Sequence, residues 1–196
     1  MVAIGWLPPL FTEKCSDRTR RWVVDDIDKI TGLPKHGQFL RSLEKYIADS
    51  QRHDQPLSLL GLNVDHLAYF NYAYGPSAGD AALGMVATIL RAEFHTNEGL
   101  YRSMGDEFRI LLPNTALPEA LVIAEHMRQA AISVDLIHPQ PHAPQRCLTF
   151  SFGVAIYPTD GKDMATLLAT ISNRIEQAKR DGRNTICYAV HQKDLE

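Results

Sequence analysis

The chain has 196 residues, of which 45% are hydrophobic and 22% charged, and its formal net charge at pH 7 is −3. These values are typical of a globular protein that folds as one domain with a short extension, and they exclude a broadly basic surface for nucleic acid. Three widely spaced cysteines, Cys15, Cys147 and Cys187, form no CxxC pair. This spacing argues against a disulfide framework or a zinc site and favours a reducing, cytoplasmic setting.

We expect the folded domain to cover residues 26–190, with an N-terminal extension over 1–25 and a tail over 191–196. The opening MVAIGWLPPLF lacks a basic n-region, so it does not resemble a signal peptide. No run of residues reaches the roughly 18 to 20 apolar positions of a membrane span. The charged stretch SDRTRRWVVDDIDKI predicts a short linker helix, and the abrupt start would suit a piece cut from a longer protein.

Hydrophobic periodicity predicts alternating helices and strands along the rest of the chain. In chain order we expect a helix over 35–52, a strand over 56–64, helices over 65–74 and 78–94, strands over 99–103 and 107–113, a helix over 117–133, a loop over 137–145, a strand over 147–158, a helix over 163–182 and a strand over 184–190. Asn114 or Thr115 can cap the helix that starts at 117. This order predicts one sheet with helices packed mainly on one face.

An acidic turn lies between two of these strands, in the stretch RSMGDEFRILLP. Gly105 is free to adopt a positive φ there, as a hairpin turn requires. Asp106 and Glu107 follow it, and a carboxylate at a strand end can bind Mg²⁺ together with phosphate oxygens. The alternative is that Gly-Asp is ordinary turn chemistry and Glu107 a charge at a strand edge.

Two further stretches carry polar residues that suit a nucleotide. Asn71 and Asp80 lie nine positions apart on successive helices, and an asparagine and an aspartate can together read the hydrogen-bonding edge of guanine. Asp80 could equally be a helix N-cap. Lys179 and Arg183, in AKRDGRN, could bind phosphates or could complement the dipole of the helix that ends there.

Five blocks taken together, DKITGLP, NVDHLAYFNYAYGPSAGDAAL, YRSMGDEFRILLP, TFSFGVAIYP and AKRDGRN, resemble in order and spacing the GGDEF domain of diguanylate cyclases, over about residues 26–190. The resemblance implies an α/β (α+β) fold with a cyclase/palm-like, mostly antiparallel five-stranded sheet and helices packed around it. It also implies a bacterial signalling activity, the condensation of two GTP molecules to cyclic di-GMP, with Mg²⁺ and a homodimer that holds one GTP per subunit.

The resemblance assigns roles to residues of this chain. The catalytic acids of the signature hairpin fall on Asp106 and Glu107, and the metal ligands on Asp106 and the backbone carbonyl of Val64. The substrate-binding positions that carry the family's residues are Asn71, Asp80, Gly105, Lys179 and Arg183.

Several positions depart from the family's pattern. The metal-binding aspartate at the end of the first strand falls on Asn63, and the aspartate two residues later, Asp65, is expected to point to the other face if the strand continues. The first glycine of the signature falls on Met104, and the phosphate-binding lysine on Ala68. The histidine of a Gly-His pair is Pro76, and the product-inhibition motif would fall on the stretch HTNE, residues 95–98, which lacks it.

These departures predict a degenerate GGDEF domain with weak or absent diguanylate cyclase activity, which binds guanine nucleotide weakly or not at all and serves as a regulatory or dimerising module. It would use Mg²⁺ only if active, and it would adjoin a sensor or a phosphodiesterase domain in a longer protein, without nucleic acid or membrane insertion. One alternative is an active diguanylate cyclase that tolerates Asn63 and Met104. A second is a protein-interaction domain without a ligand.

Overall fold

The computed structural model describes residues 26–94, 99–134 and 147–189. Five helices and five strands alternate in these ranges: α1 (His36–His53), β1 (Leu57–Val64), α2 (Leu67–Tyr74), α3 (Pro76–Phe94), β2 (Leu100–Met104), β3 (Glu107–Pro113), α4 (Leu117–Ile132), β4 (Phe150–Tyr157), α5 (Met164–Arg180) and β5 (Ile186–Cys187). The order agrees with the sequence prediction, and most bounds agree within a few residues. The predicted strand over 184–190 is the exception, because β5 has only two residues.

The prediction of the linker helix is tested only at residues 26–30. Asp26 lies in a 3-10 turn, Ile27 forms an isolated bridge with Pro34 and residues 29–30 lie in a turn, while residues 16–25 and the HTNE segment lie outside the described residues. The prediction that Asn114 or Thr115 caps α4 is wrong. The N-cap of α4 is Ala116, whose backbone N–H donates to the Glu119 carboxylate at 3.4 Å. Thr115 instead donates its hydroxyl to the carbonyl of Pro113, so it does not cap the helix.

The sheet has the strand order β2-β3-β1-β4-β5. All neighbouring strands are antiparallel except β4 and β5, which are parallel. β1 lies at the centre, and all eight of its residues are buried. Two of them are polar, Ser58 and Asn63, and Ser58 donates a hydrogen bond to the carbonyl of Thr115 at 2.7 Å, so burial leaves this hydroxyl satisfied. The fold is therefore the mostly antiparallel five-stranded α+β architecture that the resemblance implied.

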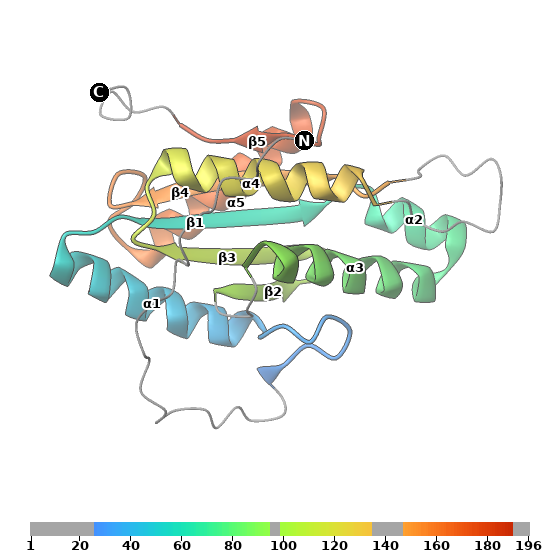
Figure 1. Cartoon of the computed structure of the whole chain (residues 1–196), viewed down its shortest axis with the longest axis horizontal. Coiled ribbons are helices and arrows are strands. Elements are labelled where there is room, and N and C mark those ends of the chain that lie inside the picture. Colours follow the sequence, from blue (N-terminus) through green and yellow to red (C-terminus); the bar gives the residue numbers. More distant parts are fainter. Residues whose placement is uncertain (1–25, 95–98, 135–146, 190–196) are drawn as a thin grey trace, which may run out of the picture.

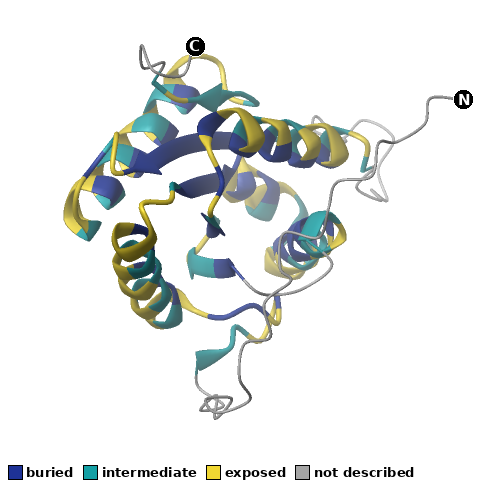
Figure 2. Ribbon diagram, turned by 60° about the vertical axis from the view of Figure 1, so that its left-hand side comes forward, coloured by how far each residue is buried: buried dark blue, intermediate teal, exposed yellow. Residues whose placement is uncertain are grey.

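Helices cover both faces of the sheet, so the prediction that they pack mainly on one face is wrong. One buried cluster joins one face of the strands to α2, α3 and α4, and a second joins the opposite face to α1 and α5. Figure 1 shows α3 and α4 in front of the sheet, and in Figure 2 the strands are mostly buried while the outer sides of the helices are exposed. The cause is that β1 and β4 are buried at every position, and a strand with two apolar faces requires a helix layer on each.

Two glycines allow α5 to lie close against the centre of the sheet. Gly61 of β1 and Gly153 of β4 stand opposite each other in the strand register. A Cβ atom at Gly61 would overlap the side chain of Ile171, and one at Gly153 would come within 2.8 Å of the Ile171 carbonyl oxygen. This close packing fixes α5 on the sheet, and the loop that follows α5 is thereby held next to the end of β1.

Candidate functional site

The acidic turn lies beside the end of the central strand. Gly105 has a φ of +57°, the left-handed conformation that favours glycine, and the turn it makes joins β2 to β3. The backbone N–H of Val64 donates to the carbonyl of Asp106 at 3.1 Å. The structure therefore brings together the predicted metal-binding positions Val64 and Asp106, which are far apart in the sequence.

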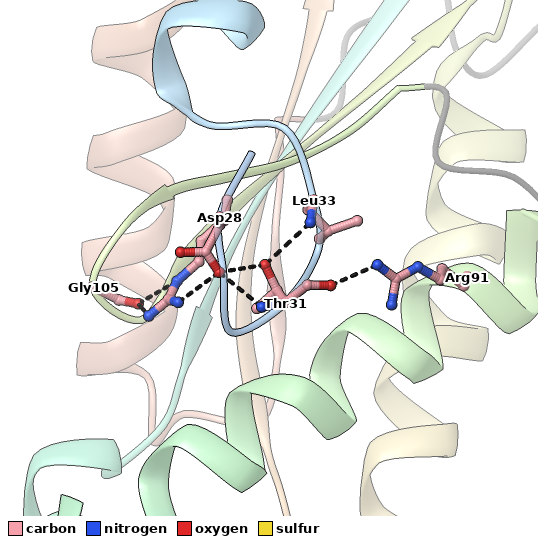
Figure 3. A network of polar contacts seen from close by, with 6 residues as sticks. Asp28, Thr31, Leu33, Arg91 and Gly105 are labelled. Atoms are coloured by element: carbon pink, nitrogen blue, oxygen red, sulfur yellow. Dashed lines mark hydrogen bonds and ion pairs between the residues drawn. The ribbon is translucent and has the colours of Figure 1, made fainter. Parts of the chain in front are cut away.

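A network of polar contacts holds the turn in place. Arg102 donates from Nε and Nη2 to the carbonyl of Gly105, at 3.1 and 2.8 Å, and from Nη1 to the carboxylate of Asp28 at 2.8 Å. The backbone N–H and hydroxyl of Thr31 donate to the same carboxylate oxygen, and Arg91 of α3 donates to the Thr31 carbonyl, as Figure 3 shows. The network ties the turn to the DKITGLP block and to α3.

The hydrogen bonds of this network lower the pKa of Asp28. Burial raises the pKa of the Asp28 carboxyl, but hydrogen bonds from Thr31 and Arg102 together outweigh burial and hold the pKa below its ordinary value of 3.8. The carboxylate is therefore ionised at neutral pH, and Arg102 and Asp28 form an ion pair whose side chains are only 11% and 18% exposed.

Asn63 lies at the end of β1, between its neighbours Glu107 on β3 and Ser151 on β4. It is buried, with 4% of its surface exposed. Its position facing Glu107 is where the resemblance places the first metal carboxylate. The side chain present is a neutral amide, so it lacks the negative charge of that ligand.

The prediction for Asp65 applied only if the strand continued, and the strand does not: β1 ends at Val64 and Asp65 lies in the turn that follows. Asp65 accepts a hydrogen bond at 2.6 Å from Ser151, the residue that stands opposite Asn63. Asp65 also accepts from the hydroxyl of Thr149 at 2.9 Å and from the backbone N–H of Asn184 at 3.1 Å. Its carboxylate thus joins β1, the start of β4 and the loop after α5, which indicates a structural role.

Glu107 lies on the same face of the sheet as Asn63. It is paired with Arg109, an arginine that the sequence analysis missed. Arg109 Nη2 donates to Glu107 Oε2 at 2.7 Å. Arg109 is buried, and Glu107 is about one third exposed. Alternation along EFRIL places residues 107 and 109 on one face, so their opposite charges were a signal that could have revealed this pair.

Asn71 and Asp80 come from the adjacent helices α2 and α3. The Asn71 side chain lies directly against Gly79, where a Cβ atom would overlap its Oδ1 atom. That oxygen is buried and has no hydrogen-bond partner among the described residues. Asp80 is exposed and belongs to the interior of α3, which begins at Pro76, so the alternative that Asp80 caps this helix is wrong. The two candidate guanine-binding residues therefore lie in neighbouring turns of packed helices.

The candidate phosphate-binding residues lie at the end of α5. Lys179 donates to Glu176 at 2.9 Å, and this hydrogen bond is the largest cause of the lowered pKa of the Glu176 carboxyl. Arg183 is exposed and has a φ of +65° in the loop that follows. The hydrogen bond from the next residue, Asn184, to Asp65 places this loop beside the end of β1.

The donor set does not fit a tightly bound divalent ion. Within the described ranges no three histidine, cysteine, aspartate or glutamate side chains are grouped so that they could hold a metal. Asp106 keeps its carboxylate, but Asn63 is neutral and Glu107 is paired with Arg109. Met104, at the signature's first position, is 77% exposed, and its side chain therefore extends from the turn instead of joining the core.

None of the helices in the described part of the chain has the length and apolar character to cross a membrane.

Comparison with curated proteins shows moderate similarity to bacterial signalling enzymes. The chain is 31% identical over 162 residues to the diguanylate cyclase DgcM of Escherichia coli (strain K12), which covers 83% of this chain and 38% of DgcM. It is 29% identical over 164 residues to the bifunctional diguanylate cyclase/cyclic di-GMP phosphodiesterase MucR of Pseudomonas aeruginosa, which covers 82% of this chain and 23% of MucR. The chain thus spans less than half the length of these relatives.

Solved structures agree with this similarity. The GGDEF domain of TpbB (YfiN) from Pseudomonas aeruginosa superimposes with a TM-score of 0.73 at 27% identity, covering 84% of this chain and 94% of that one. The diguanylate cyclase SiaD, solved in complex with its activator SiaC, gives the same TM-score and identity over 83% of this chain and 61% of SiaD.

The family model described as "Diguanylate cyclase, GGDEF domain" matches residues 25–185. This match covers all elements of the fold up to the loop before β5, including the acidic turn and both candidate nucleotide-binding stretches. Domains of this family occur in cyclic di-GMP signalling proteins, and active members generally use Mg²⁺. The chain belongs to the GGDEF domain family of diguanylate cyclases.

Proposed function

We propose that this domain binds guanine nucleotide without depending on a divalent ion, has little or no diguanylate cyclase activity, and acts as a regulatory or dimerising module of a cyclic di-GMP signalling protein. The observation that carries the proposal is a contrast within one site. The candidate residues for the base, Asn71 and Asp80, and two for the phosphates, Lys179 and Arg183, are present. At the metal positions, Asn63 is neutral and Glu107 is paired with Arg109, so that Asp106 is the carboxylate that remains.

The proposal that the domain binds a guanine base rests on Asn71 and Asp80. Asn71 Oδ1 is a buried acceptor without a partner among the described residues, and an unsatisfied buried polar atom costs about 1–3 kcal/mol. An unsatisfied buried atom in a native structure calls for an explanation, and a ligand that donates a hydrogen bond to Asn71 Oδ1 would provide one. Asp80, exposed on the next helix, could accept from the N1–H and the amino group of guanine. Lys179 and Arg183 would then bind phosphate oxygens.

The proposal that catalysis is weak or absent rests mainly on Asn63. Loss of one preorganised electrostatic group commonly lowers an enzyme's rate by about 10²–10³. This chain lacks a metal carboxylate at Asn63 and a phosphate lysine at Ala68, and both changes act on phosphoryl transfer, which depends on charge neutralisation. Together they would lower turnover by several orders of magnitude, which favours a regulatory role.

Isothermal titration of the purified chain with a non-hydrolysable GTP analogue, with and without Mg²⁺, tests the proposal. We expect binding whose Kd changes little with Mg²⁺. Asn71→Ala should weaken that binding about tenfold, the equivalent of one hydrogen bond, whereas Asn173→Ala, which removes an exposed amide of α5, should not.

Either of two results would overturn the proposal in favour of another function. Binding that requires Mg²⁺, together with conversion of GTP to cyclic di-GMP that Asp106→Ala abolishes, would identify an active cyclase. No heat of binding, together with no rise in melting temperature at millimolar nucleotide, would identify a protein-interaction domain without a ligand, because any ligand of the folded state must stabilise it.

A further inference from the structure

An arginine is buried beneath the acidic end of the sheet. Arg109 of β3 is 6% exposed. Its Nη2 atom donates to Glu107 at 2.7 Å and its Nη1 atom donates to the carbonyl of Phe108 at 3.1 Å. Its Nε atom is buried and has no hydrogen-bond partner among the described residues. A charged side chain in an otherwise apolar layer is costly unless its charge is compensated, so Arg109 requires an explanation.

The strand register places this guanidinium near Asn63, the position where the resemblance places a metal-binding aspartate. Arg109 stands opposite Gly61 of β1, and Glu107 stands opposite Asn63, so the four residues share one face of two adjacent strands. A Cβ atom at Gly61 would lie 3.4 Å from Arg109 Nη1, so the glycine leaves space for the arginine. Ile171, whose side chain lies over Gly61, is part of the apolar cluster that encloses it.

We propose that the Arg109 guanidinium supplies the positive charge that a bound divalent ion would supply at this end of the sheet, and that it holds Glu107 away from metal binding. This inference deepens the proposed function and rests on it, because it gives the reason why nucleotide binding would not need Mg²⁺. A carboxylate that is already paired at 2.7 Å is a poor ligand for a second cation. The guanidinium also repels a divalent ion.

The missing carboxylate at Asn63 is therefore only one of two causes of weak metal binding, and the positive charge of Arg109 is the other. If Asn63 were aspartate, its carboxylate would lie on the same face as Arg109, within the reach of a long side chain that still has an unpartnered Nε atom. The arginine would compensate the added charge, and Asn63→Asp alone would not create a metal site. Restoring metal affinity requires removal of the charge at Arg109 as well.

Direct binding of Mn²⁺, followed by electron paramagnetic resonance without nucleotide, tests this on the 196-residue chain. The variants are Asn63→Asp, Arg109→Met, the Asn63→Asp/Arg109→Met double variant, and Asn63→Asp/Arg109→Lys as the control that keeps the charge. Repulsion between a unit charge and a divalent ion about 6 Å apart, screened as in bulk water, corresponds to about a tenfold change in affinity. We expect the methionine double variant to bind Mn²⁺ at least about tenfold more tightly than Asn63→Asp, and the lysine control to match Asn63→Asp.

The proposal is overturned if Asn63→Asp alone binds Mn²⁺ as tightly as the methionine double variant, or if the lysine control binds as tightly as the methionine double variant. Circular dichroism melting checks that each variant is folded, and Arg109→Gln, which keeps polar atoms, replaces Arg109→Met if the latter does not fold. Because Mn²⁺ is the only ligand, this result is independent of nucleotide titration. Failure of guanine nucleotide to bind would remove the proposed function and leave the comparison of variants intact.

Discussion

Replacing Asp65 by alanine should lower the free energy of unfolding by about 3–5 kcal/mol, because it removes the acceptor of three hydrogen bonds and leaves buried donors without a partner. The carboxylate is 3% exposed and accepts three hydrogen bonds, from the hydroxyls of Thr149 and Ser151 and from the backbone N–H of Asn184. Hydrogen bonds to a charged group contribute about 1.5–3 kcal/mol each, and the gross sum is reduced because donors near the surface can turn to water. Ser151 is fully buried and has less access to water.

Thermal and urea unfolding measure this effect. For a domain of 150–250 residues, 1 kcal/mol shifts the melting temperature by about 2–4 °C, so we expect Asp65→Ala to lower it by about 10 °C. Asp65→Asn should cost only about 1–2 kcal/mol, because the amide oxygen can face Thr149 and Asn184 while Ser151 reverses to accept from the amide nitrogen. Glu44→Ala, at an exposed position of α1, is the control and should change stability by less than about 0.5 kcal/mol.

The structural role of Asp65 would be refuted by a particular pair of results. If Asp65→Ala costs less than about 1 kcal/mol, the three hydrogen bonds do not contribute as described. If the same variant also binds Mn²⁺ or nucleotide less tightly than the unchanged chain, Asp65 is a ligand and not a connector between strands.

Three further predictions concern the turn network and the packing of α5. Arg102→Met should destabilise the domain by about 2–3 kcal/mol, because it leaves Asp28 without its ion pair, and amide hydrogen exchange should increase most in the acidic turn. The pKa of Asp28 is lower in the folded domain than its ordinary value of 3.8, so its contribution to the free energy of unfolding is fully present above that value and is lost as the pH falls through the folded pKa. In unfolding measurements between neutral pH and pH 2, the Asp28→Asn variant should therefore lose less stability with acid than the unchanged chain. Gly61→Ala should cost about 1–3 kcal/mol, since its methyl group would overlap Ile171, whereas Gly37→Ala in α1, with open space around it, should stabilise the helix slightly in the same unfolding assay.

Local patterns in the sequence were sufficient to predict the order of helices and strands. The long periodic helices and the apolar strand over 56–64 have signals that depend only on neighbouring residues, so they were predicted well. The two-residue strand β5 and the cap of α4 were predicted poorly. In both places the outcome depends on contacts with other elements, which local propensity does not contain.

The prediction of helices on one face was wrong because the continuous apolar runs of β1 and β4 were not interpreted as strands with two buried faces. The charges of Glu107 and Arg109 were visible in the sequence, but their depth was not. A charged residue at a strand position is usually solvated, and only the packing of α1 and α5 on this face of the sheet shows that the arginine is enclosed.

The sequence by itself determined the family, the order of the elements and the chemical types available at the candidate site, because these depend on which residues occur and in what order. It also revealed that Asn63 and Met104 depart from the family's pattern. Only the tertiary structure decided that Asp65 joins three segments and that Arg109 already compensates Glu107. The reason is that strand register and packing bring Asp65 within hydrogen-bonding distance of Asn184, which is far away in the sequence, and bury Arg109 beside Glu107.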